Sequence, residues 1–135
     1  MIYYFMDLLE HENYSENHFC VTDKERRNIK QIENKLKENI YRNFPQIEPL
    51  SDSIGVSPSK LKTCFKKIHQ KTLYQYYSDL QMEAAKEEIL KGKSINETAE
   101  LFNYSNVSKF SNRFKEHFGV LPSKMLENNL SNLAN

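Results

Sequence analysis

The chain has 135 residues, 39% of them apolar, and a formal net charge of +1, which fits one compact domain or two small ones that share a core. Only three glycines and four prolines argue against a sandwich or barrel, because those folds need frequent turn residues. We therefore predict an all-α fold of about seven helices. No apolar run reaches the roughly 20 residues of a membrane span, and the first residues lack the features of a secretory signal, so we expect a cytoplasmic protein.

The cysteines and histidines show no pattern of a reactive site. Cys20 and Cys64 stand apart, without the spacing of a disulfide framework or a zinc site. Cys64 falls on an apolar helix face and is expected to be a core residue. His69 and His117 have no nucleophile or carboxylate at a plausible spacing. We expect no metal, no cofactor, no catalytic residue and no enzymatic activity.

The first predicted helix follows a segment without any sustained period. Residues 1–22 are expected to be a tail or the remnant of an upstream domain. Thr22 and Glu25 then form a capping-box pattern, and apolar residues recur at helical spacing until Pro45. The pattern predicts a helix over about 23–43.

Turn and cap residues define the next two helices. Pro49 favours a short helix to about Ile54, after which Gly55 can take the positive φ of a tight turn. Ser57 and Pro58 are typical of an N-cap and a first helical turn. The helix that they begin has one apolar face, formed by Leu61, Cys64, Phe65 and Ile68.

A long helix over 73 to about 91, closed by Gly92, is expected to connect two halves of the chain. Ser94 and Glu97 form a second capping box, and Asn103 suits a left-handed turn. Two further helices follow, one patterned by Phe110, Phe114, His117 and Phe118 and closed by Gly119, and a short one from Pro122. The predicted organisation is a first helix-turn-helix subdomain (23–72), a linker helix (73–92), a second helix-turn-helix subdomain (93–130) and a tail (131–135).

The two halves repeat one pattern of short helix, tight turn and second helix, which is the plan of a helix-turn-helix. The matches at an offset of 48 residues are Leu50 with Thr98, Ser51 with Ala99, Gly55 with Asn103 and Ser57 with Ser105. Leu61 and Phe65 match Phe110 and Phe114 at an offset of 49. One inserted residue explains the change of offset.

Positive charge is concentrated on the second helix of each repeat. Residues 57–71 hold five lysines and no acidic residue, and residues 105–115 hold three basic residues and no acidic one. A lysine run by itself is most often a solvated helix face, but its recurrence in the matched helix favours a polyanionic partner. A linker helix over 73–91 would be about 28 Å long, close to the roughly 34 Å between successive major grooves on one face of B-DNA.

These residues resemble the AraC/XylS family of bacterial transcription regulators, whose DNA-binding domain has two helix-turn-helix units joined by a long helix. "LSDSIGVSPSKLKTCFKK" is similar to the family's "LAxxxGxSxxxLxRxFKK". "SINETAELFNYSNVSKFSNRFKEHFGVLPSKM" is similar to its "SIxxIAxxxGFxxxSxFxRxFKxxFGxxPxxYR". The resemblance covers roughly residues 24–127. The chain departs from the family's common residues at Ser51, Thr63, Gln81, Asn103, Asn112, Met125 and Leu126, and arginine is usual at positions 63, 81 and 112.

The resemblance implies two sets of DNA-contacting residues. Its base-reading positions fall on Ser59, Lys62, Thr63, Val107, Ser108 and Asn112. The better candidates for phosphate contacts, which hold the register without reading sequence, are Lys60, Lys66, Lys67, Lys109, Arg113 and Lys115.

We expect a protein that binds specific double-stranded DNA, with two recognition helices in successive major grooves. It would regulate transcription, most often by activation in this family, through contact with RNA polymerase. Members usually carry this domain behind a sensing and dimerising domain, so dimerisation through a missing N-terminal domain is a further expectation. The alternative is a degenerate helix-turn-helix module that binds another protein, which the absent arginines at 63, 81 and 112 favour slightly.

Overall fold

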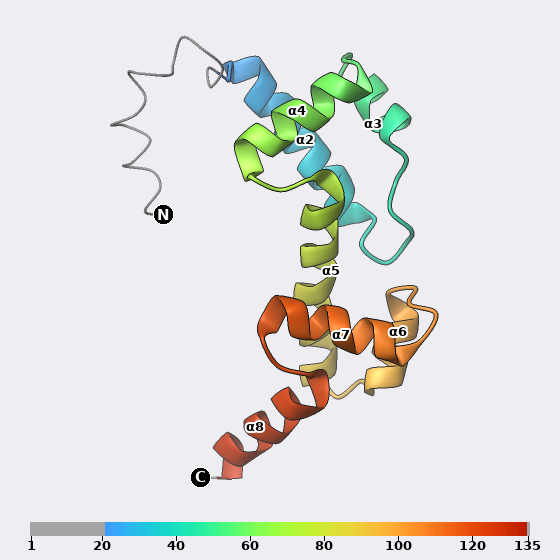
Figure 1. Cartoon of the computed structure of the whole chain (residues 1–135), viewed down its shortest axis with the longest axis vertical. Coiled ribbons are helices and arrows are strands. Elements are labelled where there is room, and N and C mark those ends of the chain that lie inside the picture. Colours follow the sequence, from blue (N-terminus) through green and yellow to red (C-terminus); the bar gives the residue numbers. More distant parts are fainter. Residues whose placement is uncertain (1–20, 135) are drawn as a thin grey trace, which may run out of the picture. The chain divides into compact units, whose positions relative to one another are not determined.

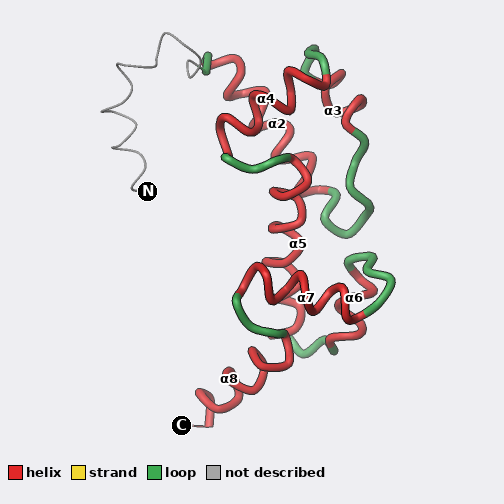
Figure 2. The backbone as a smooth tube through the Cα atoms, in the orientation of Figure 1, coloured by secondary structure: helices red, strands yellow, loops and turns green. Residues whose placement is uncertain are grey.

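The computed structural model describes residues 21–134, which form seven helices and no strand (Figures 1 and 2). The helices are α2 (Asp23–Glu38), α3 (Ile47–Ser53), α4 (Pro58–His69), α5 (Leu73–Leu90), α6 (Ile95–Leu101), α7 (Val107–Phe118) and α8 (Pro122–Ala134). The all-α prediction is confirmed. None of these helices is long and apolar enough to cross a membrane. The predicted N-terminal tail, residues 1–22, lies outside the described residues except for residues 21 and 22.

The described residues divide into two compact units, one of residues 21–34 and 46–73 and the other of residues 35–45 and 74–134. In the first, α3 packs on α4; in the second, α7 packs on both α6 and α8. The helix expected to be a linker therefore belongs, from Tyr74 onward, to the second unit. The helix α8 continues to Ala134, through residues for which the sequence predicts a tail.

Local capping explains where most helices begin. The capping box of α2 is present, since the backbone N–H of Glu25 donates to the Thr22 hydroxyl and that of Thr22 to the Glu25 carboxylate, both at 3.0 Å. The same reciprocal pair joins Ser94 and Glu97 at the start of α6. At the start of α4 the Ser57 hydroxyl accepts from the backbone of Lys60 at 3.1 Å. These three predictions are confirmed, and each satisfies donors that the first helical turn leaves without intrahelical partners.

The two units build the same turn with different residues. Gly55 and Asn103 follow α3 and α6 with φ of 70° and 66°, as predicted for a left-handed position. The next residues close both turns alike, because Val56 N–H donates to Ser51 and Tyr104 N–H donates to Ala99. These bonds satisfy carbonyls at the helix ends.

In the second unit, the N-cap of α7 lies one residue later than the sequence match between the two halves indicates. The N-cap of α7 is Asn106, whose side-chain oxygen accepts from the backbone of Lys109 at 2.8 Å. Ser105, which we aligned with Ser57, therefore belongs to the turn. The inserted residue lies between Asn103 and Asn106. Both Ser105 and Asn106 have a side-chain oxygen that can accept the capping hydrogen bond, so residue type alone could not show which of them is the N-cap.

The helix α2 ends at Glu38, five residues before the predicted end. The segment that follows is held by side chains of the second unit. Gln81 donates to the carbonyl of Ile40 at 2.8 Å, and Asn103 donates to that of Tyr41 at 3.2 Å. The Tyr77 hydroxyl lies within hydrogen-bonding distance of two further carbonyls of this segment, those of Asn39 and Arg42. These distant partners satisfy carbonyls that the helix would otherwise have bonded, so the helix can end early.

Each unit buries an apolar core under the second helix of its helix-turn-helix, α4 in the first unit and α7 in the second. In the first unit the buried residues include Ile29, Ile32, Leu50, Leu61, Cys64, Phe65 and Leu73. In the second, a cluster is formed by Met82, Ala85, Ile89, Ala99, Phe102, Phe110 and Phe114. Cys64 is buried as predicted, and burial raises the pKa of its thiol, which disfavours the reactive thiolate.

Polar pairs tie α2 to both ends of α4. Lys60 Nζ lies 2.8 Å from Glu25 Oε2 near the start of α4, and His69 Nε2 lies 2.8 Å from Glu33 Oε2 at its end. His69 and Glu33 are 36 positions apart, so the absence of a carboxylate at a local spacing from His69 did not reveal this partner. The hydrogen bond from Lys60, with that from the Thr22 backbone, lowers the pKa of Glu25.

Replacing Ser94 by alanine should lower the free energy of unfolding by about 1 kcal/mol, the usual value of an N-cap hydroxyl. Urea denaturation followed by circular dichroism measures the change. Ser131→Ala is the matched control, since Ser131 is exposed inside α8 and its replacement should change the free energy by less than about 0.5 kcal/mol. Equal effects of the two substitutions would contradict the capping role.

Replacing Lys60 by methionine should raise the pKa of Glu25 toward the ordinary 4.5, because the hydrogen bond that lowers it most is removed. A carbon-detected NMR titration of the Glu25 carboxyl measures this. The lowered pKa stabilises the fold above pH about 4.5, and that contribution disappears as the pH falls through the folded-state pKa. Lys62→Met is the control: Lys62 lies about 200° around α4 from Lys60 and should leave Glu25 unchanged.

Candidate nucleic-acid interface

The helix α4 turns a basic face to solvent on the side opposite its apolar anchors. Leu61 and Phe65 are 0% exposed, which directs the opposite side of the helix outward. The residues on that side are exposed Ser59, Lys62, Thr63 and Lys66 and half-buried Lys67. This face thus holds the three predicted base-reading residues of the first unit and two of its three predicted phosphate residues, Lys66 and Lys67. No acidic residue lies anywhere in α4.

A shallow depression runs along this face and is lined by Lys62, Thr63, Lys66, Lys67 and Gln70. Gln70 was not among the predicted site residues. Its backbone is left-handed, with φ of 60°, and it ends α4. Its position seven residues after Thr63, two helical turns further on the same face, is the signal that could have identified it. The amide adds both a donor and an acceptor to a surface otherwise made of lysines and a hydroxyl.

Lys60 differs from the other lysines of α4, because its ammonium group is paired with Glu25. The lysine stays more than half exposed, and the pair raises its pKa. A phosphate contact by Lys60 would have to compete with, or share, this carboxylate. Its predicted role stays a prediction.

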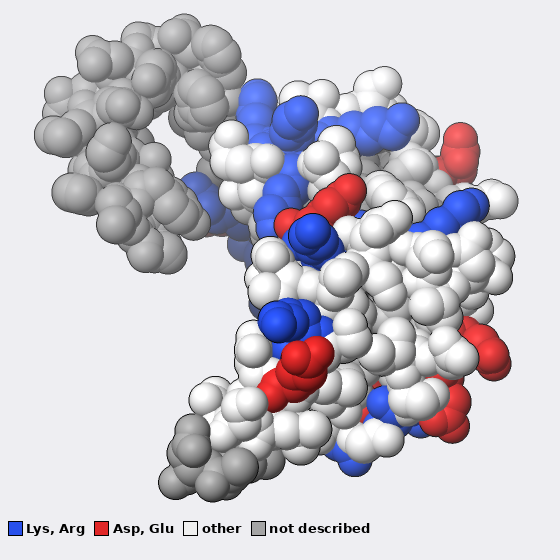
Figure 3. Space-filling model, turned by 60° about the horizontal axis from the view of Figure 1, so that its bottom comes forward, with Lys and Arg blue, Asp and Glu red and all other residues white. Residues whose placement is uncertain are grey.

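The helix α7 presents a smaller polar face in the second unit. Ser108, Lys109, Asn112 and Lys115 are exposed, while Phe110 and Phe114 are fully buried. Val107 is half-buried and packs against the core of this unit, so its side chain is shared between packing and the surface. On the face of the molecule drawn in Figure 3, lysine or arginine and aspartate or glutamate side chains all reach the surface. Four of the predicted residues of α7 thus lie on one accessible face.

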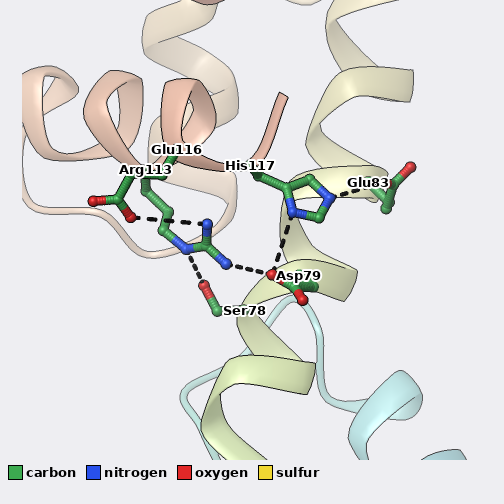
Figure 4. A network of polar contacts seen from close by, with 6 residues as sticks. All are labelled: Ser78, Asp79, Glu83, Arg113, Glu116 and His117. Carbon is green, nitrogen blue, oxygen red and sulfur yellow. Dashed lines mark hydrogen bonds and ion pairs between the residues drawn. The ribbon is translucent and has the colours of Figure 1, made fainter. Parts of the chain in front are cut away.

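Arg113 is held inside the second unit, unlike the other predicted phosphate residues of α7. Its Nε lies 2.6 Å from Ser78 Oγ and its Nη2 lies 2.6 Å from Asp79 Oδ1, both on α5 (Figure 4). Its side chain is only 22% exposed. The sequence did not reveal these contacts, because Arg113 and its partners are about 35 residues apart. A phosphate role for Arg113 remains a prediction that these contacts do not support.

His117 lies beside Arg113 and also contacts α5 (Figure 4). Its Nδ1 is 3.3 Å from Asp79 Oδ1 and its Nε2 is 2.8 Å from Glu83 Oε2. These carboxylates are again distant in sequence from His117, so local spacing could not reveal them. The two carboxylates meet opposite nitrogens of the ring, so they cannot share one metal ion with it. Among residues 21–134 no group of three His, Cys, Asp or Glu side chains could hold a metal ion.

Gln81, one of the departures from the family pattern, is not part of the exposed polar face of α4 or of α7. It is 5% exposed and donates to Ile40 and to the Tyr77 hydroxyl. The missing arginine at this position thus concerns the attachment of the segment after α2. It does not bear on a choice between a DNA-binding and a protein-binding module.

Comparison with known proteins agrees with this architecture. Residues 50–128 match the family model of a helix-turn-helix domain. The chain is 31% identical over 101 residues to the probable transcription factor PqrA of Proteus vulgaris, a match of 74% of this chain and 80% of that protein. It is 30% identical over 108 residues to the HTH-type transcriptional regulator YidL of Escherichia coli K12, a match of 78% of this chain and 36% of YidL.

A solved structure shares the fold. A transcriptional regulator from Chromobacterium violaceum, described as containing an AraC-type DNA-binding domain, superposes with a TM-score of 0.68 at 21% identity, over 73% of this chain and 88% of that one. The chain spans about a third of YidL, so nothing about the remainder of that protein is transferred. The matched family comprises transcription regulators and is not a class of enzymes. The chain belongs to the AraC/XylS-type family of helix-turn-helix transcriptional regulators, and residues 50–128 match its DNA-binding domain.

Proposed function

We propose that this protein binds specific double-stranded DNA and regulates transcription, with α4 and α7 as its recognition helices. The observation that carries the proposal is the repeated arrangement of the two units. Each holds its second helix by fully buried anchors, Leu61 with Phe65 and Phe110 with Phe114, and exposes lysines and small polar side chains on the other side. Such a face offers both phosphate neutralisation and base-edge hydrogen bonds.

The side chains suggest a division of roles. We propose that Ser59, Lys62 and Thr63 on α4, and Val107, Ser108 and Asn112 on α7, contact bases. Lysine pairs well with guanine and asparagine with adenine, while an apolar side chain can pack on a thymine methyl group. Lys66, Lys67, Lys109 and Lys115 are exposed or half-exposed and would contact phosphates. For Lys60, a phosphate would have to compete with, or share, the Glu25 carboxylate.

We further propose that the two recognition helices enter successive major grooves. The continuous 18-residue helix α5 supports this, since it is about 27 Å long and the grooves repeat on one face every 34 Å or so. A modest bend of the DNA would make up the difference, and bending energies depend on sequence.

Activation by contact with RNA polymerase is the mode of regulation that we propose. The exposed carboxylates outside α4, such as Glu83, Glu87 and Glu100, provide surface that is unsuited to DNA and open to a protein partner. Transcription from a promoter carrying the bound site, with and without the protein, tests the direction of regulation. A dimerising domain elsewhere in a longer chain is a further proposal, and it rests on family resemblance alone.

Replacing Lys66 and Lys67 by alanine should weaken binding to all duplexes alike, because phosphate contacts carry no sequence information. The slope of log affinity against log salt should fall by about 0.9 for each phosphate that the variant no longer neutralises. Fluorescence anisotropy with a duplex selected by the protein from a random pool, at 50 to 200 mM salt, measures both quantities. The control is Lys91→Ala with Lys124→Ala, which removes two exposed lysines outside the recognition helices.

An unchanged salt slope in the Lys66/Lys67 variant would refute their phosphate role. A wild-type affinity that does not depend on salt would overturn DNA binding altogether. It would favour the alternative, a helix-turn-helix module that binds another protein.

Hydroxyl-radical footprinting of the selected duplex should show two protected patches whose centres lie about 10 base pairs apart. That spacing is one turn of B-DNA, the distance between successive major grooves on one face. A control in which Phe114→Ala removes a fully buried anchor of α7 should abolish only one patch, if the first unit keeps its fold. A single patch with the wild-type protein would contradict two-groove binding.

A further inference from the structure

A cluster of five polar side chains joins α7 to α5, and we call it the α7 latch: Ser78, Asp79, Glu83, Arg113 and His117 (Figure 4). All five belong to the second unit. Arg113 makes two contacts of 2.6 Å, to the Ser78 hydroxyl and the Asp79 carboxylate. His117 contacts Asp79 at 3.3 Å and Glu83 at 2.8 Å. One helix thus offers two cations or donors a turn apart, and the other offers two carboxylates a turn apart.

The latch lies beside the proposed reading face of α7 and not on it. Successive residues are about 100° apart around a helix, so Arg113 and His117 differ by about 40°, and Arg113 lies about 100° from Asn112. Phe110 and Phe114, on the buried stripe, lie about 60° and 100° from Arg113 on its other side. The latch therefore occupies the border between the core of the unit and the surface that would meet bases.

Apolar packing and the latch constrain α7 in different ways. Burial of Phe110 and Phe114 holds the helix on the core, but contact between apolar side chains is not directional. Hydrogen bonds weaken steeply when their angle departs from linearity, and a guanidinium has a planar, rigid set of donors. The contacts of Arg113 to two neighbouring residues of α5 consequently resist rotation of α7 about its own axis. Such rotation would move Ser108 and Asn112 relative to the bases.

We propose that Arg113 and His117 are positioning residues, which fix the rotation of α7 through Ser78, Asp79 and Glu83 and thereby set its base specificity. This inference rests on the DNA binding proposed above. It assigns Arg113 a role distinct from a phosphate contact, the role expected from sequence. Its side chain is only 22% exposed and is already paired with a carboxylate, whereas Lys109 and Lys115 on the same helix are exposed.

Asp79→Asn separates the two roles of Arg113, because one predicts a change in overall affinity and the other a change in discrimination between duplexes. If Arg113 contacts phosphate, removing its carboxylate partner frees the guanidinium and deletes a negative charge, so affinity should rise. If Arg113 positions α7, the amide holds it less firmly and discrimination between duplexes should fall. Glu116→Gln is the matched control: it removes a carboxylate 4.0 Å from Arg113 that is 74% exposed and lies outside the latch.

The experiment measures anisotropy with two probes, the selected duplex and a scrambled duplex of equal length and composition. For Asp79→Asn and Arg113→Ala we expect the ratio of the two Kd values to fall about tenfold, the order of one misplaced bidentate base contact. The salt slope on the scrambled duplex should stay at the wild-type value. Glu116→Gln should leave the ratio unchanged. Arg113→Lys, which keeps the charge but not the rigid fork, should restore only part of the ratio.

Two results would overturn the latch. One is an unchanged ratio in Asp79→Asn. The other is a salt slope that falls by about 0.9 in Arg113→Ala, which identifies a phosphate contact. Urea unfolding of each variant shows whether it is folded. If Asp79→Asn does not fold, Ser78→Ala replaces it, because it keeps every charge and deletes one directional contact of a buried hydroxyl. A wild-type protein that binds both duplexes equally would overturn the proposed function itself.

Discussion

Burial of one stripe of each recognition helix is the constraint on which the rest of the structure depends. Leu61 and Phe65 on α4, and Phe110 and Phe114 on α7, are four residues apart in each helix and fully buried. A helix that commits one face to a core has only the opposite face to offer a partner. The lysines and hydroxyl groups on the opposite face of α4 and α7 are therefore directed to solvent by the buried anchors, and no contact inside the unit is needed to direct them. Removing an aromatic anchor would lower the free energy of unfolding by several kcal/mol. It would also leave the orientation of the exposed face unconstrained.

The two units reach this arrangement with the same backbone and different side chains. Gly55 and Asn103 both take a left-handed conformation after the first helix, and Gln70 and Gly119 both do so after the second. In the first unit glycine follows the first helix (Gly55), and in the second unit glycine follows the second helix (Gly119). Asparagine tolerates this conformation well among residues with a side chain. Glutamine at Gln70 carries more steric cost, which other contacts must offset. The backbone geometry, not the residue type, is what the repeat preserves.

Features set within a few residues of sequence were predictable, and those set across the fold were not. Both capping boxes, the left-handed Asn103 and the anchors of each helix depend on neighbours up to about four positions away, and all follow from local sequence patterns. The early end of α2 depends on Tyr77 and Gln81, some 35 to 41 residues further along. The carboxylate partners of His69, Arg113 and His117 are equally distant. No spacing rule reaches that far, so the lysines of the site could be predicted but not the polar contacts that hold its helices in place.

The distribution of ion pairs divides basic residues of α4 and α7 into two groups with different physical consequences. Lys60 and Arg113 each have a carboxylate within 2.8 Å, which neutralises much of their field. By contrast, the positive field of Lys62, Lys66, Lys109 and Lys115, which are exposed, is not neutralised in this way. In a chain of net charge +1 the attraction to a polyanion must come from local groups of exposed bases such as these, since the net charge of the protein offers almost none. Under the proposed function, a small number of exposed cations would keep nonspecific binding weak. More of the total affinity would then depend on directional contacts from helices held at a fixed rotation.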